Sequence, residues 1–180
     1  MVQRLEAIAN GMIIVTCIAV LSILALQFNA ARQRGSQQSK HQFLKAGERL
    51  DGIDDLRLND SSLTLIMWLS ADCKYCIQST PFYQRLSDTV KKTEPGQTQL
   101  VVVTKDTQEV ADAFIRDNNL AVAQVLTASA RQQAMLRVPG TPSLILVDRA
   151  RWVKKVWFGK LDSSAEQEVV STLLARPSAP

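Results

Sequence analysis

Residues 63–81 have the sequence LTLIMWLSADCKYCIQSTP, and this stretch decides the fold. The first part, 63–69, is a run of bulky and mostly apolar residues, which predicts a buried β-strand. Residues 70–72 interrupt that run, and two cysteines follow in the spacing Cys-x-x-Cys. Cys73 therefore stands where a strand gives way to a helix.

The position of Cys73 has a chemical consequence. The first backbone N–H groups of a helix have no partner within the helix, and the helix dipole places partial positive charge there. Both effects stabilise a thiolate, the nucleophilic form of cysteine, and the neighbouring Lys74 favours it further. Cys76 follows one helical turn later. A disulfide between the two cysteines is therefore within reach, and redox chemistry is the preferred interpretation.

Two other interpretations of the cysteine pair fit less well. A structural disulfide that closes so short a loop restricts the unfolded chain little, so it adds little stability. A zinc site needs further ligands, and the chain offers only Cys17, inside an apolar segment, and a single histidine, His41. A soft metal ion bound by the two thiolates remains the main alternative to redox chemistry.

Three features of the sequence resemble the thioredoxin superfamily, in particular the membrane-anchored TlpA/ResA-like and redoxin-type thiol–disulfide oxidoreductases of bacteria. They are the strand followed by Cys73-Lys74-Tyr75-Cys76, a proline five residues after the second cysteine, and the segment VPGTP, 138–142, before an apolar strand. The resemblance covers about residues 44–174. It implies a thioredoxin-like α/β fold in which Pro142 forms a cis-proline loop, with Thr141 before it, that faces the Cys73–Cys76 pair and contacts the substrate.

The resemblance also implies catalysis by Cys73 and Cys76 through a redox-active disulfide, on protein disulfide or dithiol substrates, with no metal or cofactor. Many thioredoxins carry an acid six residues before the first cysteine, to take the proton of the second thiol, but this chain has Met67 there. We expect Lys74, Tyr75 and Asp72 to tune the pair, with the charge of Asp72 opposing the Cys73 thiolate. The Lys-Tyr dipeptide does not indicate whether the protein reduces or oxidises its substrates.

Two other activities of related proteins fit the sequence less well. A copper(I) chaperone would use both thiolates, but related chaperones add a histidine near the thiols, whereas His41 lies far from them in the sequence. A peroxidase of the redoxin type would have a proline and a threonine ahead of the first cysteine. This chain has residues 69–72, LSAD, in their place.

Length and composition set the outer bounds. A chain of 180 residues with 46% hydrophobic residues is typical of one globular domain with an appendage. The net charge of +4 is modest, and the basic residues are scattered, so nothing indicates nucleic-acid binding. Three cysteines do not form a disulfide scaffold.

The appendage is predicted to be a membrane anchor. No charged residue occurs between Ala7 and Ala31, which is enough helix to cross roughly 30 Å of hydrocarbon. The predicted organisation is a flank at 1–10, a single transmembrane helix at 11–28, a polar tether at 29–43, the thioredoxin-like domain at 44–176 and a tail at 177–180. An uncleaved signal anchor is preferred, and a cleaved signal peptide is the alternative.

The side of the membrane is harder to predict. Arg4 precedes the anchor, while Arg32, Arg34 and Lys40 follow it, so a literal positive-inside count would leave the domain in the cytoplasm. The resemblance implies the opposite, a single-pass inner-membrane protein whose catalytic domain lies in the periplasm with a membrane or periplasmic redox partner. Long domains translocate despite flanking charge, so the periplasmic location is the prediction.

The remaining sequence predicts alternating elements. Strands are expected at 100–103, 122–126, 143–148 and 152–158. Helices are expected at 74–91, from 106 to about 118, and from Ser163 or Ser164 onward, and a helical turn is expected between the strand at 122–126 and Met135. Residues 43–60 are expected to be irregular, with one short strand at 56–58. This order predicts a mixed central sheet with helices on both faces.

Helical spacing also predicts which side chains are buried. The residues expected to face the core are Ile77, Phe82, Leu86 and Val90 of the first helix, Val110, Phe114 and Ile115 of the second, and Val169, Leu173 and Leu174 of the last. Pro81 is expected to kink the first helix. Trp68, Trp152 and Trp157 are expected in the core or on a sheet face.

Overall fold

The structure is a computed structural model, and it describes residues 43–175. The predicted flank, anchor, tether up to residue 42 and tail therefore lie outside the described residues, as do Cys17 and His41. Between residues 43 and 175, no helix combines the length and the apolar character needed to cross a membrane.

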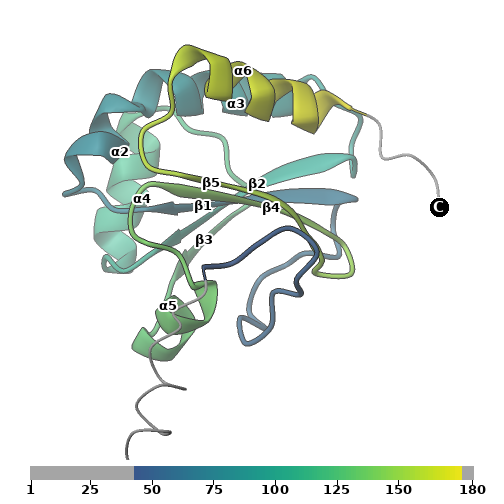
Figure 1. Cartoon of the computed structure of the whole chain (residues 1–180). Coiled ribbons are helices and arrows are strands. Elements are labelled where there is room, and N and C mark those ends of the chain that lie inside the picture. Colours follow the sequence, from purple (N-terminus) through teal and green to yellow (C-terminus); the bar gives the residue numbers. More distant parts are fainter. Residues whose placement is uncertain (1–42, 176–180) are drawn as a thin grey trace, which may run out of the picture. The chain divides into compact units, whose positions relative to one another are not determined.

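A five-stranded mixed sheet forms the centre of the domain, with the strand order β3-β2-β1-β4-β5 (Figure 1). Its strands are β1 (Leu63–Leu69), β2 (Thr98–Thr104), β3 (Gln124–Thr127), β4 (Ser143–Asp148) and β5 (Val153–Phe158). The first three are parallel, whereas β4 is antiparallel to β1 and β5 is antiparallel to β4. All of the predicted strands except the one at 56–58 are thus confirmed, although β2 begins two residues earlier, β3 two residues later and β5 one residue later than expected.

Strand β1 is the central strand of this sheet. All seven of its residues are buried, and it pairs with β2 on one side and with β4 on the other. A strand covered on both faces needs apolar side chains along its whole length, which explains the uninterrupted run in the sequence. The predicted fold class, an α/β mixed sheet with covered faces, is confirmed for the described residues.

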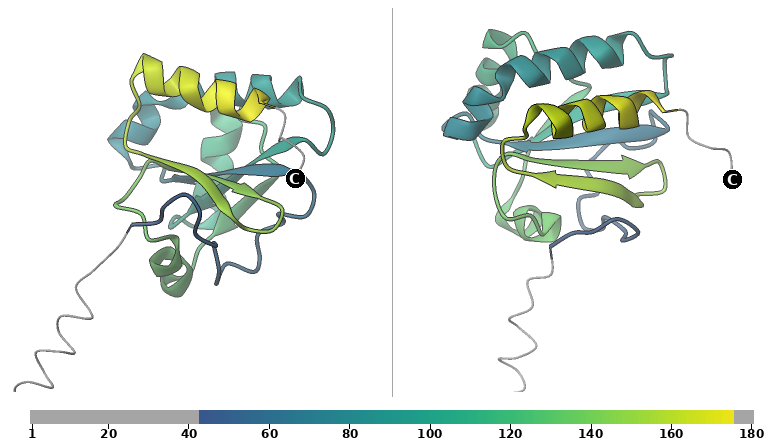
Figure 2. Two further views of the ribbon diagram at one scale, coloured as in Figure 1. Left: turned by 45° about the vertical axis from the view of Figure 1, so that its right-hand side comes forward. Right: turned by 45° about the horizontal axis from the view of Figure 1, so that its top comes forward.

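The helices are α2 (Lys74–Gln78), α3 (Thr80–Lys91), α4 (Gln108–Asp117), α5 (Ala130–Leu136) and α6 (Ser163–Leu174). Helices α3 and α6 lie together over one face of the sheet, and α5 lies on the opposite side (Figures 1 and 2). Helices α3 and α4 each connect two adjacent parallel strands. Such crossovers are right-handed, so two made in the same direction along the sheet place their helices on one face.

Each face of the sheet has its own core. The first core joins alternate residues of the strands to α3 and α6, with Phe114 and Ile115 of α4 packed against it. The second core joins the other set of alternate residues to Leu136 of α5 and to the irregular lead-in. That lead-in, 43–62, contributes Leu44, Leu50, Ile53, Leu56 and Leu58, all buried. The lead-in thus covers the face of the sheet that α5 is too short to cover.

The lead-in corrects one prediction. Residues 56–58 form no strand, and Arg49 instead makes an isolated bridge with Trp152. The apolar residues of this segment are buried by packing against the sheet face, without joining its hydrogen-bonded ladder. A short apolar run has the same composition in a β-strand and in an irregular segment packed on a sheet, so the sequence did not distinguish the two structures.

The helix after the cysteines also differs from the prediction. It is two helices, because Ser79 ends α2 and begins α3. Pro81 is the second residue of α3, where its missing N–H would have no partner within the helix. The proline therefore starts a helix and does not kink one. In the last helix, Asp162 supplies the cap by accepting a hydrogen bond from the Ala165 N–H at 2.8 Å, in place of Ser163 or Ser164.

Four side chains expected in the interior are exposed. Ile77 is 53% exposed, and Val110, Leu174 and Trp152 are also largely accessible. For Ile77 the reason is the break at Ser79, since α2 and α3 do not share one continuous apolar stripe. The other residues predicted on these helix faces are buried or partly buried.

Replacement of Leu86 and Ile77 by alanine tests this correction. Leu86 is fully buried in the first core, so Leu86→Ala is expected to lower the free energy of unfolding by about 2–5 kcal/mol. Ile77→Ala removes an exposed side chain and is expected to cost less than about 0.5 kcal/mol. Urea unfolding of both variants measures the difference. Equal losses would show that Ile77 belongs to the core after all.

Candidate active site

The sheet register brings three loops to one edge of the domain. Because β1 and β2 are parallel, the loops that follow them, with Cys73 and Asp106, leave the sheet at the same edge. Because β4 is antiparallel to β1 and Ser143 pairs with Trp68, the residue before β4, Pro142, lies at that edge as well. The candidate site therefore combines residues that lie up to 69 positions apart in the sequence.

Cys73 is the N-cap residue of α2, as predicted. Its Sγ accepts a hydrogen bond from the backbone N–H of Cys76 at 3.3 Å. The same thiol donates to the carbonyl oxygen of Thr141 at 3.4 Å. The Thr141–Pro142 peptide bond is cis, as the resemblance implied, and the loop lies against Cys73. The structure thus brings Cys73, Cys76 and Thr141 into one contact network.

The environment of Cys73 favours its thiolate. Partial burial pushes the pKa of Cys73 upward, but hydrogen bonds with the side chains of Cys76 and Thr141 and with the backbone N–H groups of α2 outweigh it. The pKa of Cys73 is therefore lower than its ordinary value. The side chain is also partly exposed, so a partner can reach the sulfur.

Cys76 has the opposite properties. Its side chain is 0% exposed and belongs to the first core. Burial, with the nearby Cys73 as a second cause, raises the pKa of Cys76 to about 12. Both cysteines are free thiols in this structure. The pair therefore consists of one accessible, acidic thiol and one buried thiol that keeps its proton.

The three residues predicted to tune the pair are all exposed, and they differ in their contacts. Asp72 is exposed; it accepts a hydrogen bond from the Ser70 hydroxyl and lies 3.7 Å from Lys105 Nζ, and these contacts hold its pKa below the usual range. Lys74 is exposed on α2. Tyr75 has an exposed ring, and its backbone N–H lowers the pKa of Cys73. Lys105, which the sequence analysis did not single out, thus partly neutralises Asp72.

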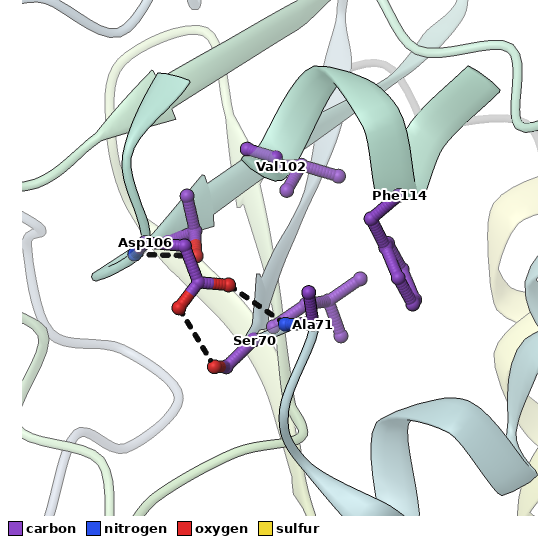
Figure 3. Close-up of a pocket in the computed structure, with 8 residues that line it drawn as sticks. Ser70, Ala71, Val102, Asp106 and Phe114 are labelled. Atoms are coloured by element: carbon purple, nitrogen blue, oxygen red, sulfur yellow. Dashed lines mark hydrogen bonds between the residues drawn. The ribbon is translucent and has the colours of Figure 1, made fainter. Parts of the chain in front are cut away.

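Asp106 is a second residue that the sequence analysis did not assign to the site. Its carboxylate accepts hydrogen bonds from the Ser70 hydroxyl at 2.9 Å and from the Ala71 N–H at 2.7 Å (Figure 3). These bonds tie the loop before Cys73 to the end of β2. The sequence predicted only that Asp106-Thr107 begins a helix, and Thr107 is indeed the cap of α4.

Beneath the cysteines, the core contains hydroxyl groups but no charge. Of the buried residues between 43 and 175, none is Asp, Glu, Lys, Arg or His. Met67, at the position where many thioredoxins have an acid, is fully buried in the cluster that contains Cys76. Tyr83 belongs to the same cluster, and its hydroxyl finds no hydrogen-bond partner among the described residues. The hydroxyls of Ser79 and Thr80 are also buried and unpaired there.

The site has few groups suited to a metal ion. Within residues 43–175, no three His, Cys, Asp or Glu side chains are arranged to hold one. His41 lies outside the described residues, so the copper(I) hypothesis stays a prediction.

The fold has many solved counterparts. A thiol–disulfide isomerase from Corynebacterium glutamicum is 20% identical, with a TM-score of 0.52 over 74% of this chain and 95% of the other. The thioredoxin domain of a thiol–disulfide oxidoreductase from Bacteroides vulgatus is 18% identical, with a TM-score of 0.56 over 73% and 99%. StoA from Bacillus subtilis is 18% identical, with a TM-score of 0.52 over 71% and 93%.

These likenesses show that the chain has a thioredoxin-like fold, which confirms the fold that the resemblance implied. The sequence itself matches no protein-family model and no curated protein. Any activity must therefore be argued from the geometry of the site.

Asp106→Ala tests the role of this carboxylate in holding the Cys73 loop. The variant leaves the Ala71 N–H and the Ser70 hydroxyl without this acceptor, so the free energy of unfolding is expected to fall by about 1–3 kcal/mol. Asp117→Ala is the control. Among residues 43–175 the Asp117 side chain makes only an exposed ion pair with Arg116, so its loss should cost less than about 1 kcal/mol. Chemical unfolding measures both. An unchanged free energy of unfolding in Asp106→Ala would show that the loop before Cys73 keeps its conformation without the Asp106 carboxylate.

The pH dependence of Cys73 alkylation tests the electrostatics of the site. Because the folded protein lowers the pKa of Cys73, a larger fraction is thiolate at neutral pH, and alkylation should reach half its maximal rate below the value of about 8.5 expected for free cysteine. In urea the midpoint should return to that value. Iodoacetamide labelling of the reduced protein, followed by mass spectrometry of tryptic peptides, isolates this thiol, because cleavage after Lys74 separates Cys73 from Cys76. An unchanged midpoint on unfolding would contradict the assignment.

Proposed function

We propose that this protein is a thiol–disulfide oxidoreductase that exchanges disulfides with protein substrates through Cys73 and Cys76. The observation that carries the proposal is the asymmetry of the two thiols. Cys73 is accessible with a lowered pKa, whereas Cys76 is buried with a raised pKa. This asymmetry is what a sequential exchange requires, since one sulfur must meet the substrate first and the other must wait.

In the reductive direction, the Cys73 thiolate attacks one sulfur of the substrate disulfide. A bond forms between Cys73 and that sulfur, the substrate disulfide breaks, and the second substrate sulfur leaves with the electron pair and takes a proton. Cys76 then loses its proton and attacks Cys73. The Cys73–Cys76 disulfide forms, and the first substrate sulfur leaves as a thiol. The oxidative direction is the same path in reverse.

The Thr141–Pro142 loop is the proposed contact for the substrate chain. The Thr141 carbonyl lies 3.4 Å from the Cys73 sulfur, so a substrate held at this loop is next to the nucleophile. Pro142 has no N–H group, and the proposed contact is main-chain pairing of the neighbouring Thr141 backbone with an extended peptide segment. The partly exposed Thr141 side chain lies beside the same sulfur and completes this contact.

Three neighbours are proposed to tune the pair. The backbone N–H of Tyr75 lowers the pKa of Cys73. By their charges alone, Lys74 is proposed to favour the Cys73 thiolate and Asp72 to oppose it. The unfavourable effect of the Asp72 charge on the Cys73 thiolate is weakened, because Asp72 is exposed, forms an ion pair with Lys105 and accepts a hydrogen bond from Ser70. The balance among these groups sets the redox potential, which determines whether the protein reduces or oxidises its substrates.

The proposed location is the periplasmic side of the inner membrane. The support is the uncharged segment from Ala7 to Ala31, long enough for a single-pass anchor, and the resemblance to anchored relatives. In this arrangement the tether holds the domain away from the bilayer, and a membrane or periplasmic protein exchanges electrons with it. Disulfide exchange suits that compartment, because it is oxidising.

Two serine variants test the proposed order of attack. Cys73→Ser should reduce insulin disulfides no faster than the background rate, because the nucleophile is missing. Cys76→Ser should still attack but should accumulate mixed disulfides, which are visible as larger species on non-reducing gels. Normal turnover by the Cys76 variant would overturn these roles.

The same Cys76→Ser variant also tests the substrates and the location. Mixed disulfides trapped in intact cells are expected to contain periplasmic or membrane proteins, identified by mass spectrometry. Cys73→Ser, Cys76→Ser is the matched control, because it should trap none. Trapping of cytoplasmic proteins alone would contradict the periplasmic location while leaving the exchange chemistry intact.

A further inference from the structure

The loop between β1 and α2 determines where the Cys73 sulfur lies, and Ser70 is its first residue. The Cys73 N–H donates a hydrogen bond to the Ser70 carbonyl oxygen at 3.2 Å. Ser70 is 2% exposed, so its polar groups must find partners within the protein. Burial raises the pKa of Cys76, and a hydrogen bond with the Ser70 backbone works against that rise. The main chain of Ser70 therefore acts on both cysteines.

Asp106 holds this loop from the end of the neighbouring strand (Figure 3). Its two carboxylate oxygens accept separate hydrogen bonds, one from the Ser70 hydroxyl at 2.9 Å and one from the Ala71 N–H at 2.7 Å. Asp106 is itself held, because its N–H donates to the Thr104 hydroxyl oxygen at 3.1 Å. Thr104 is buried at the end of β2 and pairs with Leu69, the last residue of β1. Hydrogen bonds thus connect the two strands just beyond the sheet.

Asp72 is the other carboxylate at the Ser70 hydroxyl, but it cannot replace Asp106. A hydroxyl has one hydrogen, so Ser70 donates to one of the two carboxylates at a time. Asp72 belongs to the loop itself, and its side chain is 76% exposed, so its contact with Ser70 does not tie the loop to the sheet. The bond from the Ala71 N–H to Asp106 is independent of this competition.

The acidity of Cys73 depends on the position of its sulfur. The sulfur accepts a hydrogen bond from the Cys76 N–H at 3.3 Å and donates to the Thr141 carbonyl at 3.4 Å. The backbone N–H of Tyr75 lowers the pKa of Cys73 as well, whereas partial burial raises it. Hydrogen bonds weaken steeply when their geometry departs from the optimum. A displaced loop would therefore weaken the bonds that favour the thiolate and leave the effect of burial in place.

We propose that Asp106 is a positioning residue for Cys73: by holding the loop before it, the Asp106 carboxylate keeps the Cys73 sulfur against the N–H groups of α2 and the proline loop. This inference rests on the disulfide exchange proposed above, in which the Cys73 thiolate attacks first. The sign of the effect distinguishes position from charge. A carboxylate that acts by its charge raises the pKa of a nearby thiol. Asp106, acting through the loop, lowers the pKa of Cys73.

Asp106→Ala and Asp106→Asn test the proposal through the pH midpoint of Cys73 alkylation, measured on the reduced protein with iodoacetamide and tryptic peptide mass spectrometry. Asp106→Ala loses both contacts, so its midpoint should rise by about half a pH unit to one pH unit, the equivalent of one ordinary hydrogen bond. Asparagine keeps an acceptor oxygen for the Ala71 N–H, and its amide nitrogen can donate to the Ser70 hydroxyl. The midpoint of Asp106→Asn should therefore stay at the wild-type value or fall slightly.

Two further variants complete the set. Ser70→Ala removes one of the two contacts and keeps the Asp106 carboxylate, so its midpoint should rise by less than that of Asp106→Ala. Asp117→Ala is the matched control, because it removes an exposed carboxylate at the other end of α4 and should leave the midpoint unchanged. Urea unfolding shows whether each variant is folded under the assay conditions. Every variant keeps the charged side chains of the loop and its neighbours, which are Asp72, Lys74 and Lys105.

The outcomes separate the two proposals. An unchanged or lowered midpoint in a folded Asp106→Ala would overturn the positioning role while the exchange chemistry stands. An equal rise in Asp106→Asn or in Asp117→Ala would overturn it as well, and if Asp106→Ala does not fold, an unchanged midpoint in Ser70→Ala would do so. A wild-type protein that reduces no insulin disulfide would overturn the proposed function, and the alkylation midpoints would still report whether Asp106 positions the Cys73 sulfur.

Discussion

The pairing of strand β1 with β2 on one side and β4 on the other is the constraint on which the site depends. The register Trp68 to Ser143 places the Thr141–Pro142 loop beside the end of β1, and the parallel β2 brings Asp106 to the same edge. Because β1 is buried on both faces, a shift by one residue would exchange its two apolar sets and disturb both cores at once. The position of Cys73 is therefore fixed by the whole sheet.

The two thiols differ in exposure and in pKa because they lie in different surroundings within this fold. Cys73 lies at the start of α2, where backbone N–H groups and the Thr141 loop surround a sulfur that solvent still reaches. Cys76, one turn later, turns into the first core, where desolvation holds its proton in place. A helix of five residues is enough to separate the two roles, because Cys73 is the cap residue before the helix, whereas Cys76 lies within it and is buried.

Much of the fold was predictable, and the errors have one physical origin. The strands at 63–69 and 143–148 were predicted with their observed bounds, because strand composition and turn residues are local signals. The exposed Ile77 and Val110 were predicted as buried, because helical spacing defines an apolar stripe but not which neighbour covers it. The irregular lead-in was similarly ambiguous, since its leucines are buried by a sheet formed from residues that follow it.

The strand, the Cys-x-x-Cys spacing at a helix start and the proline loop could be recognised from the sequence alone, because each consists of adjacent residues with strong local preferences. The resemblance to thioredoxins also indicated that Met67 stands where many of those proteins carry an acid. Only the tertiary structure decided that Asp106 holds the loop before Cys73 and that Tyr83 is buried in the same cluster as Cys76. Nothing in the neighbouring sequence marks these two residues, because contacts across the sheet and between separate helices arise from strand register and packing.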